Sequence, residues 1–341
     1  MIGDPMTIQY SPRCSHKSDL ALLSVITPAY NEEHNLPLLF ERLQKTMAAI
    51  KMDWEWLVVD DHSTDATFAC LSEISRRAPQ VNVIRLARNF GSHTALSCGL
   101  QHARGDCAVV LAADLQDPPE LIPEFLARWR SGAQVVWGVR GMRPDDKART
   151  VGFSRLYFFL MRRFVGLQNM PPTGSDFFLI DHRVIHAFRQ FQETNVSTIG
   201  LLTWLGFRQE SFSYDKEKRV YGTSGWTLEK KIKILVDSIT AFTYKPIRLM
   251  SYTGFVFALF GFISAGIIIG KALLWGSPVQ GYPSIMAGVL VIGGIQMLML
   301  GVLGEYIWRA LDEARRRPHY IIEDTAGNLQ NQQQAEPNKQ D

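Results

Sequence analysis

The stretch LLSVITPAYNEE, residues 22–33, sets the pattern for the first two thirds of the chain. Its apolar first half is typical of a buried strand, and it ends in a polar turn that carries two carboxylates. Further short apolar runs follow, separated by segments with helical periodicity, and the expected strands are 22–28, 56–60, 81–86, 107–112 and 134–138. Strands that alternate with helices predict an α/β domain built around a mainly parallel sheet.

Between the first two expected strands, apolar residues recur at helical spacing and predict one buried helix face. These residues are Leu36, Leu39, Phe40, Leu43, Met47 and Ile50. They are expected to belong to the core. Ligands of such sheets gather at the carboxyl ends of the strands, so the residues directly after each strand are the candidates for chemistry.

Two stretches near the C-terminus, 251–270 and 282–304, contain no charged residue. At about 1.5 Å of rise per residue, 20 helical residues cover roughly 30 Å, the thickness of the hydrocarbon core of a bilayer. We therefore expect two membrane-spanning helices, at about 251–272 and 282–306. Basic residues lie outside both ends of the pair and only Lys271 lies between them. By the positive-inside rule, the large domain and both termini are expected on the cytoplasmic side of the inner (plasma) membrane.

The expected organisation has four parts: a flexible tail at 1–20, a cytoplasmic catalytic domain at 21–245, a membrane anchor at 246–308, and a cytoplasmic segment at 309–341. The last segment is expected to be disordered from about 325, because its polar end has almost nothing to bury. Within the domain, residues 147–168 interleave arginines with aromatic residues. This pattern fits either an ordinary packed helix or a helix that lies in the membrane interface.

The four cysteines show neither a metal-binding spacing nor a disulfide framework, which fits a reduced compartment. The 36 basic and 33 acidic residues nearly balance. No nucleic-acid partner is expected.

Carboxylates also follow the second expected strand, in the sequence DDHSTD at 60–65. Asp65 fits the cap of the following helix. Capping explains the adjacent pair Asp60 and Asp61 less well, because two neighbouring carboxylates repel each other unless a ligand or a donor lies between them. This pair is therefore a candidate acceptor of hydrogen bonds from a nucleobase or a ribose.

Eight short motifs follow one another along the chain: PAYNEE (28–33), DDHSTD (60–65), RNFG (88–91), DLQDPPE (114–120), GSDFF (174–178), RVYGTSGW (219–226), GEY (304–306) and RPHY (317–320). This ordered set resembles the family 2 glycosyltransferases with the GT-A fold. It is most similar to the polyprenyl-phosphate glycosyltransferases, a group that includes dolichol-phosphate mannose synthase and bacterial undecaprenyl-phosphate glucosyltransferases. The resemblance covers about residues 22–322.

This resemblance implies a GT-A domain that binds a UDP- or GDP-sugar, followed by two transmembrane helices. The residues implied to contact the donor are Pro28, Ala29, Tyr30, Glu32, Asp60, Asp61, Arg88, Asn89, Gly91, Asp114, Gln116, Arg219 and Ser224. Asp114 and Gln116 are the implied ligands of Mg²⁺ or Mn²⁺, which would stabilise charge on the departing nucleoside diphosphate. Asp114, Arg219 and Asp176 are the expected catalytic residues, with Asp176 as a base or orienting group, although it also fits an ordinary loop carboxylate. The histidines, among them His62 and His93, are interpreted as structural or surface groups.

The chain departs from the family pattern at two positions. Ala112 stands in place of the first acid of an Asp-x-Asp motif, and Gly225 stands where a lysine often precedes the tryptophan. Either the metal is held with one carboxylate fewer, or activity is impaired.

A lipid phosphate is a chemically sensible acceptor, because a phosphate monoester is already mostly dianionic at neutral pH. The site must then supply cations, and arginines such as Arg149, Arg155, Arg162, Arg163 and Arg219 suit phosphate oxygens. The expected function is inverting transfer of a sugar, with UDP-glucose as the preferred donor, to polyprenyl (undecaprenyl) phosphate. The product would be a lipid-linked donor for modification of cell-envelope glycans. Glycines in both spans favour close helix packing and a homo-oligomer.

Two other functions stay open at this point. One is a processive polysaccharide synthase, although the Gln-x-x-Arg-Trp segment usual in such enzymes is missing from the sequence. The other is a catalytically impaired membrane scaffold that binds a nucleotide-sugar.

Overall fold

The computed structural model describes residues 21–141, 175–191, 198–217, 281–315 and 317–329, with shorter pieces at 159, 161–165, 170–171 and between 243 and 274. Its strands are β1 (Leu23–Ala29), β2 (Trp54–Asp60), β3 (Val81–Leu86), β4 (Cys107–Val110), β5 (Val135–Arg140), β6 (Phe177–Asp181), β7 (Gln209–Tyr214) and β8 (Ile322–Ala326). Its α-helices are α1 (Asn35–Ile50), α2 (Thr67–Arg77), α3 (Ser92–His102), α4 (Ile122–Arg130), α6 (His182–Phe188), α7 (Thr198–Trp204) and α10 (Tyr282–Ala314).

Within the described residues the strands form one sheet in the order β7-β5-β6-β4-β1-β2-β3-β8. Strands β4, β1, β2 and β3 are parallel neighbours, and β5 is parallel to β7. Strand β6 runs antiparallel between β4 and β5, and β8 runs antiparallel to β3. The predicted α/β fold with a mainly parallel sheet is therefore confirmed, and the five predicted strands agree with β1 to β5 to within two residues at each end.

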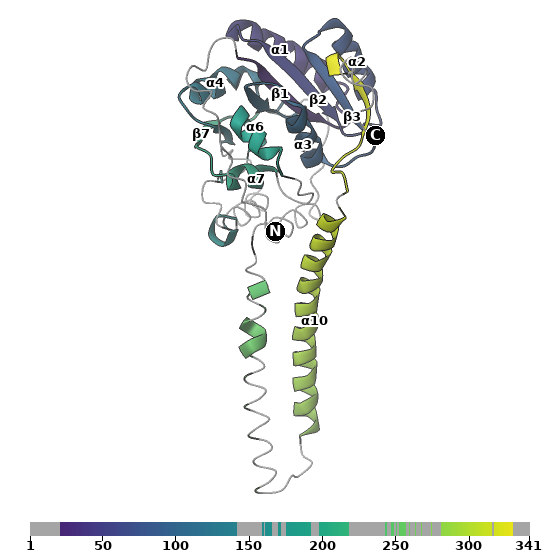
Figure 1. Ribbon diagram of the computed structural model, residues 1–341, viewed down its shortest axis with the longest axis vertical. Helices are drawn as coiled ribbons and strands as arrows, with labels where there is room; N and C mark the ends of the chain where they lie inside the picture. The colour runs from purple at the N-terminus through teal and green to yellow at the C-terminus, as the bar shows by residue number, and fades with distance from the viewer. Residues whose placement is uncertain are drawn as a thin grey trace, which may run out of the picture.

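Helices cover both faces of the sheet (Figure 1). One core cluster joins α1, α2 and α4 to one face, and a second cluster joins α3, α6 and α7 to the other. The predicted buried face of α1 is confirmed, since Leu36, Leu39, Leu43 and Met47 are buried and the remaining two residues pack against them. The ring of Phe40 stacks on Trp56 with the centroids 5.6 Å apart. The parallel pairing of β1 with β2, in which Ala29 is opposite Asp60, brings the carboxyl ends of the two strands next to each other.

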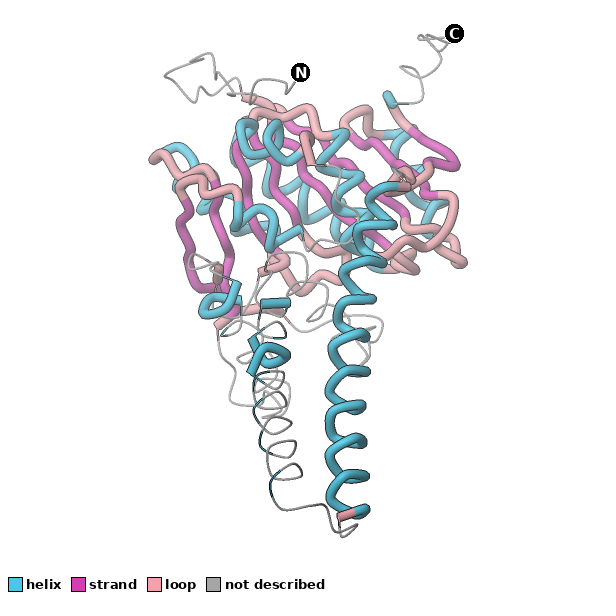
Figure 2. The backbone as a smooth tube through the Cα atoms, turned by 60° about the horizontal axis from the view of Figure 1, so that its bottom comes forward, coloured by secondary structure: helices cyan, strands magenta, loops and turns pink. Residues whose placement is uncertain are grey.

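Helix α10 projects away from the sheet domain as a single long element (Figures 1 and 2). Its 33 residues span about 50 Å. Large apolar side chains along it are exposed, with Ile285 at 68%, Met297 at 69% and Leu300 at 60%. In the part of the chain that the structure describes, no helix meets the combined length and hydropathy required for a membrane span.

Two described residues that precede α10 in the chain lie against it. A Cβ atom added to Gly254 would lie 2.8 Å from the methyl carbon of Met299. Nearer the sheet domain, the hydroxyl of Tyr306 donates a hydrogen bond to the carbonyl of Thr243 over 2.8 Å. Helix α10 is therefore in contact with residues of the segment that comes before it.

Strand β8 corrects the expected domain boundaries. The sequence analysis places the whole catalytic domain before residue 246 and disorder from about 325, but β8 follows α10 and joins the sheet at the edge of β3. Thr325 and Ala326 are buried there. The polar composition of this segment hides its role, because an edge strand gains backbone hydrogen bonds whatever its side chains are.

Most of the amphipathic segment 147–168 lies outside the described residues. The part that is described includes the π-helical turn Met161–Val165, in which Met161 is buried while Arg162 and Arg163 are exposed. Both interpretations of the segment stay predictions.

Candidate active site

A cavity of about 360 Å³ opens at the carboxyl ends of the central strands. It brings together eight of the residues that the sequence predicts for the site: Pro28, Ala29, Tyr30, Glu32, Asp61, Asp114, Gln116 and Asp176. They come from the ends of β1, β2 and β4 and from the residue before β6. This is the edge at which open α/β sheets bind their ligands.

The turns after β1 and β2 are joined to each other by side chains. The amide of Asn31 donates to the hydroxyl of Ser63 over 2.9 Å, and the side-chain oxygen of Asn31 accepts from the amide of Thr64, also over 2.9 Å. The amide of Glu32 donates to the hydroxyl of Thr67 over 2.9 Å. Asn31 has a left-handed backbone with φ of 56°, which asparagine tolerates better than most residues. The result is a fixed wall that presents Tyr30 and Glu32 to the cavity.

Asp61 lines the cavity and also shapes the loop beside it. Its two carboxylate oxygens accept hydrogen bonds from the amides of Phe90 and Gly91, over 2.7 and 2.8 Å. Burial raises the pKa of Asp61 above its ordinary value, and the two amides offset part of that effect. Asp61 therefore fixes the start of α3 against the turn that follows β2.

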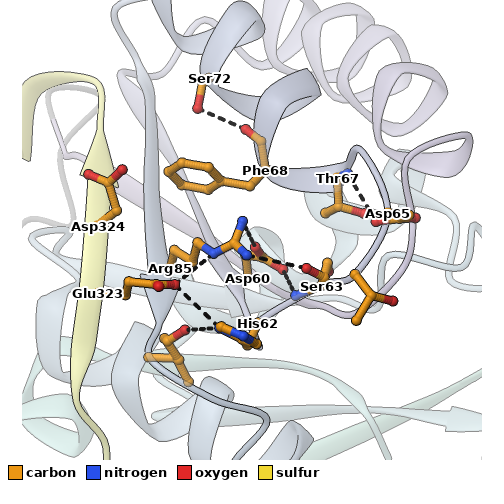
Figure 3. Close-up of polar contacts among 12 residues, drawn as sticks. Asp60, His62, Ser63, Asp65, Thr67, Phe68, Ser72, Arg85, Glu323 and Asp324 are labelled. Carbon is orange, nitrogen blue, oxygen red and sulfur yellow. Dashed lines mark hydrogen bonds and ion pairs between the residues drawn. The ribbon is translucent and has the colours of Figure 1, made fainter.

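Asp60 is placed differently from the expectation. Its side chain is fully buried and is not among the described residues that line the cavity. One oxygen accepts from the amide of Ser63 over 2.9 Å, and the other lies 3.8 Å from a guanidinium nitrogen of Arg85 (Figure 3). Asp60 therefore supports the turn in the described structure, and its predicted contact with a donor stays a prediction. Asp65 accepts from the amide of Thr67, the first residue of α2, but the N-cap position itself is occupied by Ala66, so Asp65 is not the predicted cap.

Other predicted donor contacts are not brought to the cavity. Arg88 and Asn89 are exposed, and the guanidinium of Arg88 lies over the ring of Phe90, 4.3 Å from its centroid. Neither they nor Gly91 are among the described lining residues. The predicted contacts of Arg219 and Ser224 lie outside the described residues.

The DLQ sequence after β4 adopts an unusual backbone. Leu115 has φ of 59°, a region that residues other than glycine seldom occupy, and its side chain is buried. This turn lets Asp114 and Gln116, on either side of Leu115, both line the cavity. The backbone amide of Gln116 donates to the Asp114 carboxylate over 3.2 Å. The side-chain amide of Gln116 donates to the carbonyl of Glu217 over 3.4 Å.

The turn after β4 offers few oxygen ligands for a metal ion. Asp114 is the one carboxylate there that lines the cavity in the described chain, and Ala112 supplies no ligand. Among the residues that the structure describes, no group of three or more His, Cys, Asp or Glu side chains could hold a metal ion. Mg²⁺ commonly takes one or two protein carboxylates beside phosphate oxygens and waters, so the residues present fit a metal shared with a diphosphate.

Two titratable residues of the cavity were missed by the sequence analysis. Lys216 follows β7, and its ammonium lies 3.3 Å from the carboxylate of Asp117, which also accepts a hydrogen bond from Tyr214. Burial raises the pKa of Asp117, and Lys216 offsets part of that rise. Lys216 could have been identified in the sequence as a basic residue at the end of a strand. It was missed because β7 was not predicted as a separate strand.

His93 is the second missed residue, because it was interpreted as a structural or surface group. It is the second residue of α3, and its ring lines the cavity. Burial lowers the pKa of His93, and the nearby carboxylate of Asp176 offsets part of that shift. The imidazole is therefore neutral at neutral pH.

Comparisons with known proteins agree with this geometry. The family described as glycosyl transferase family 2 matches residues 24–188, and a second family, the GtrB C-terminal hairpin, matches residues 245–310. An uncharacterized glycosyltransferase of Synechocystis sp. is 35% identical over 89% of this chain and 96% of its own length. The bactoprenol glucosyl transferase of Shigella phage SfV is 32% identical over 88% of this chain and 97% of its own length.

Among solved structures, glucosyl-3-phosphoglycerate synthase from Mycobacterium tuberculosis, in complex with Mn²⁺, UDP and phosphoglyceric acid, is 18% identical. The alignment covers 64% of this chain and 77% of that one, with a TM-score of 0.46.

The mixed sheet, the cavity at its carboxyl edge and the family match together support a glycosyltransferase with the GT-A fold. The chain belongs to glycosyl transferase family 2, and it is an enzyme of the transferase class.

Proposed function

We propose that this protein transfers glucose from UDP-glucose to polyprenyl phosphate on the cytoplasmic face of the membrane. The observation that carries the proposal is the cavity itself, where the Asp114–Gln116 turn lies in the same pocket as Asp176 and Lys216, in a chain whose residues 245–310 match the GtrB C-terminal hairpin. Relatives over nearly the whole length are named bactoprenol glucosyl transferases, which supports glucose as the sugar and undecaprenyl phosphate as the acceptor.

The wall formed by Tyr30, Glu32 and Asp61 is the proposed site of the nucleoside. Tyr30 is 44% exposed at the cavity edge, so its ring is available for stacking on a base. Glu32 and Asp61 supply acceptor oxygens for donor groups of a base or ribose. The same residues suit a uridine or a guanosine, and the names of the relatives favour glucose as the sugar.

Asp114 and Gln116 would hold Mg²⁺ or Mn²⁺ on the diphosphate. A divalent cation supplies charge neutralisation for the leaving nucleoside diphosphate. The ammonium of Lys216, held near the cavity by Asp117, contributes a further positive charge from the protein.

In the transfer step, an oxygen of the acceptor phosphate attacks the anomeric carbon and forms the new carbon–oxygen bond. The bond from that carbon to the diphosphate oxygen breaks, and its electron pair leaves with UDP. One displacement inverts the configuration. Because the phosphate is already deprotonated, Asp176 is proposed to orient the acceptor and need not remove a proton.

The hairpin is proposed to hold this site at the bilayer as a two-helix anchor. The proposal is supported by the match of residues 245–310 to the GtrB C-terminal hairpin and by the exposed apolar side chains of α10. Charge-free stretches at 251–270 and 282–304 support it further. The glycines of both stretches suit close contact between helices, so a homo-oligomer in the membrane is part of the proposal.

A donor panel with the purified full-length protein in detergent tests the function. UDP- and GDP-sugars are offered one at a time with undecaprenyl phosphate and Mg²⁺ or Mn²⁺, and lipid products are identified by mass spectrometry. The wild-type protein with UDP-glucose is expected to give a hexosyl phospholipid. Asp114→Asn should reduce the amount of this product by about 100-fold or more, while the surface variant Glu124→Gln on α4 should form it as the wild type does. The absence of a glycolipid with every donor would leave the scaffold as the better account.

A further inference from the structure

The strand that follows the hairpin meets β3 with an irregular register. Arg85 is opposite Asp324, but its neighbour Leu86 is opposite Ile322. Glu323 therefore has no partner residue in the ladder. A residue at such a bulge has its side chain redirected relative to a regular strand.

The redirected side chain of Glu323 reaches two residues of the sheet domain (Figure 3). Its carboxylate accepts a hydrogen bond from the Nε of Arg85 over 2.9 Å, and it lies 3.3 Å from the Nδ1 of His62. The next residue, Asp324, points away from this cluster in Figure 3 and accepts a hydrogen bond from the amide of Thr325. Adjacent carboxylates on one strand thus have different surroundings.

Arg85 connects Glu323 to the turn after β2. Its guanidinium lies 3.8 Å from the fully buried carboxylate of Asp60 and donates to the carbonyl of Ser63 over 3.4 Å. It also lies over the ring of Phe68, 5.2 Å from its centroid. A buried carboxylate is unfavourable without a nearby cation, so the position of Arg85 determines how well the Asp60 turn is stabilised.

The turn that begins at Asp60 also shapes the cavity. Asp61 lines the cavity directly, and Ser63 accepts the hydrogen bond from Asn31 that fixes the wall beside Tyr30 and Glu32. A continuous set of contacts therefore runs from Glu323, through Arg85 and Asp60, to the wall proposed to bind the nucleoside.

We propose that Glu323 is a positioning residue for the donor site, through which the strand after the hairpin holds the turn at 60–64 in the shape that binds the nucleotide. The inference rests on the proposed function, because it requires a nucleotide in this cavity. Only seven residues, 315–321, separate the last residue of α10, Ala314, from the first residue of β8, Ile322. The end of the hairpin is therefore linked to the donor site by a short segment of chain.

The test compares Glu323→Gln with the matched variant Asp324→Asn in the full-length protein. UDP binding is measured by calorimetry, and the KM for UDP-glucose and kcat are measured in the glycolipid assay. Because Glu323 is 46% exposed and Arg85 23% exposed, loss of the ion pair is expected to weaken UDP binding and to raise KM about fivefold. The value of kcat is expected to stay the same, and Asp324→Asn is expected to change neither constant.

Arg85→Lys provides a second variant that keeps the charge and loses the forked geometry. Arg85→Lys is expected to raise the KM for UDP-glucose in the same way as Glu323→Gln. The variant that combines both substitutions should show little further increase in KM. An unchanged KM in Glu323→Gln, or a fall in kcat at constant KM, would overturn the inference. A wild-type protein that neither binds UDP nor makes glycolipid would instead contradict the proposed function.

Discussion

The ammonium of Lys216 lies 3.3 Å from the buried carboxylate of Asp117. Tyr214, two residues earlier and at the end of β7, donates a hydrogen bond to the same carboxylate. The end of β7 is thereby fixed to the loop after β4, and Lys216 lines the cavity together with Asp114. Of the described residues in the cavity wall, Lys216 is the one lysine or arginine.

Lys216→Met should lower kcat/KM by about 10- to 100-fold, because a hydrogen bond to a charged phosphate is worth about 1.5–3 kcal/mol. It should also lower the melting temperature, since Asp117 loses its neighbouring cation. Lys216→Arg keeps the charge and is expected to retain most of the activity. Equal turnover by Lys216→Met and wild type in the glycolipid assay would remove Lys216 from the site.

Asp114→Asn should reduce transfer by about 100-fold or more, since the substitution removes a charge placed for the transition state. The side chain of asparagine has nearly the same size as that of aspartate, so the melting temperature of Asp114→Asn should stay close to that of wild type. Metal removal by a chelator should have the same effect on wild type, and added Mg²⁺ or Mn²⁺ should reverse it. Wild-type rates in Asp114→Asn would show that the metal is held elsewhere.

His93 should make the stability of the protein depend on pH. Burial lowers its pKa in the folded state below the ordinary value of 6.5. Between those two values the unfolded chain binds a proton that the folded chain does not, so stability falls as the pH falls below about 6.5. Melting temperatures measured over this range should vary less with pH in His93→Gln than in wild type. Parallel profiles for the two proteins would contradict a buried neutral imidazole.

The hairpin should anchor the protein in a membrane. After expression in a bacterium, the full-length protein is expected to stay in the membrane fraction through an alkaline carbonate wash and to need detergent for release. A reporter fused to the C-terminus should be active in the cytoplasm, because basic residues flank the pair of spans. Release by the wash alone would contradict an integral anchor.

The sequence predicts the sheet domain well where local pattern and burial agree. Strands such as β3 and the buried face of α1 are apolar runs with a clear period, and the structure has them at the predicted positions. Motifs at the strand ends also predict most of the cavity, because parallel strands bring their carboxyl ends to one edge.

The remaining features depend on long-range contacts that a local pattern does not contain. Asp60 and Asp61 are adjacent in sequence, yet of the two only Asp61 lines the cavity, because Asp60 ends β2 with a fully buried side chain and Asp61 lies in the turn after it. Strand β8 is polar and pairs with β3 across more than 230 residues of chain, so neither it nor the contact of Glu323 with Arg85 could be predicted from composition.

The most direct test of the central claim compares two acceptors that differ only in the phosphate. Full-length protein receives UDP-glucose with either undecaprenyl phosphate or undecaprenol, and both released UDP and lipid product are measured. The account predicts one UDP released for each glucosyl undecaprenyl phosphate formed, with inverted anomeric configuration, and no product from undecaprenol. Glucosylation of undecaprenol, growth of a polymer, or UDP binding without any lipid product would contradict it.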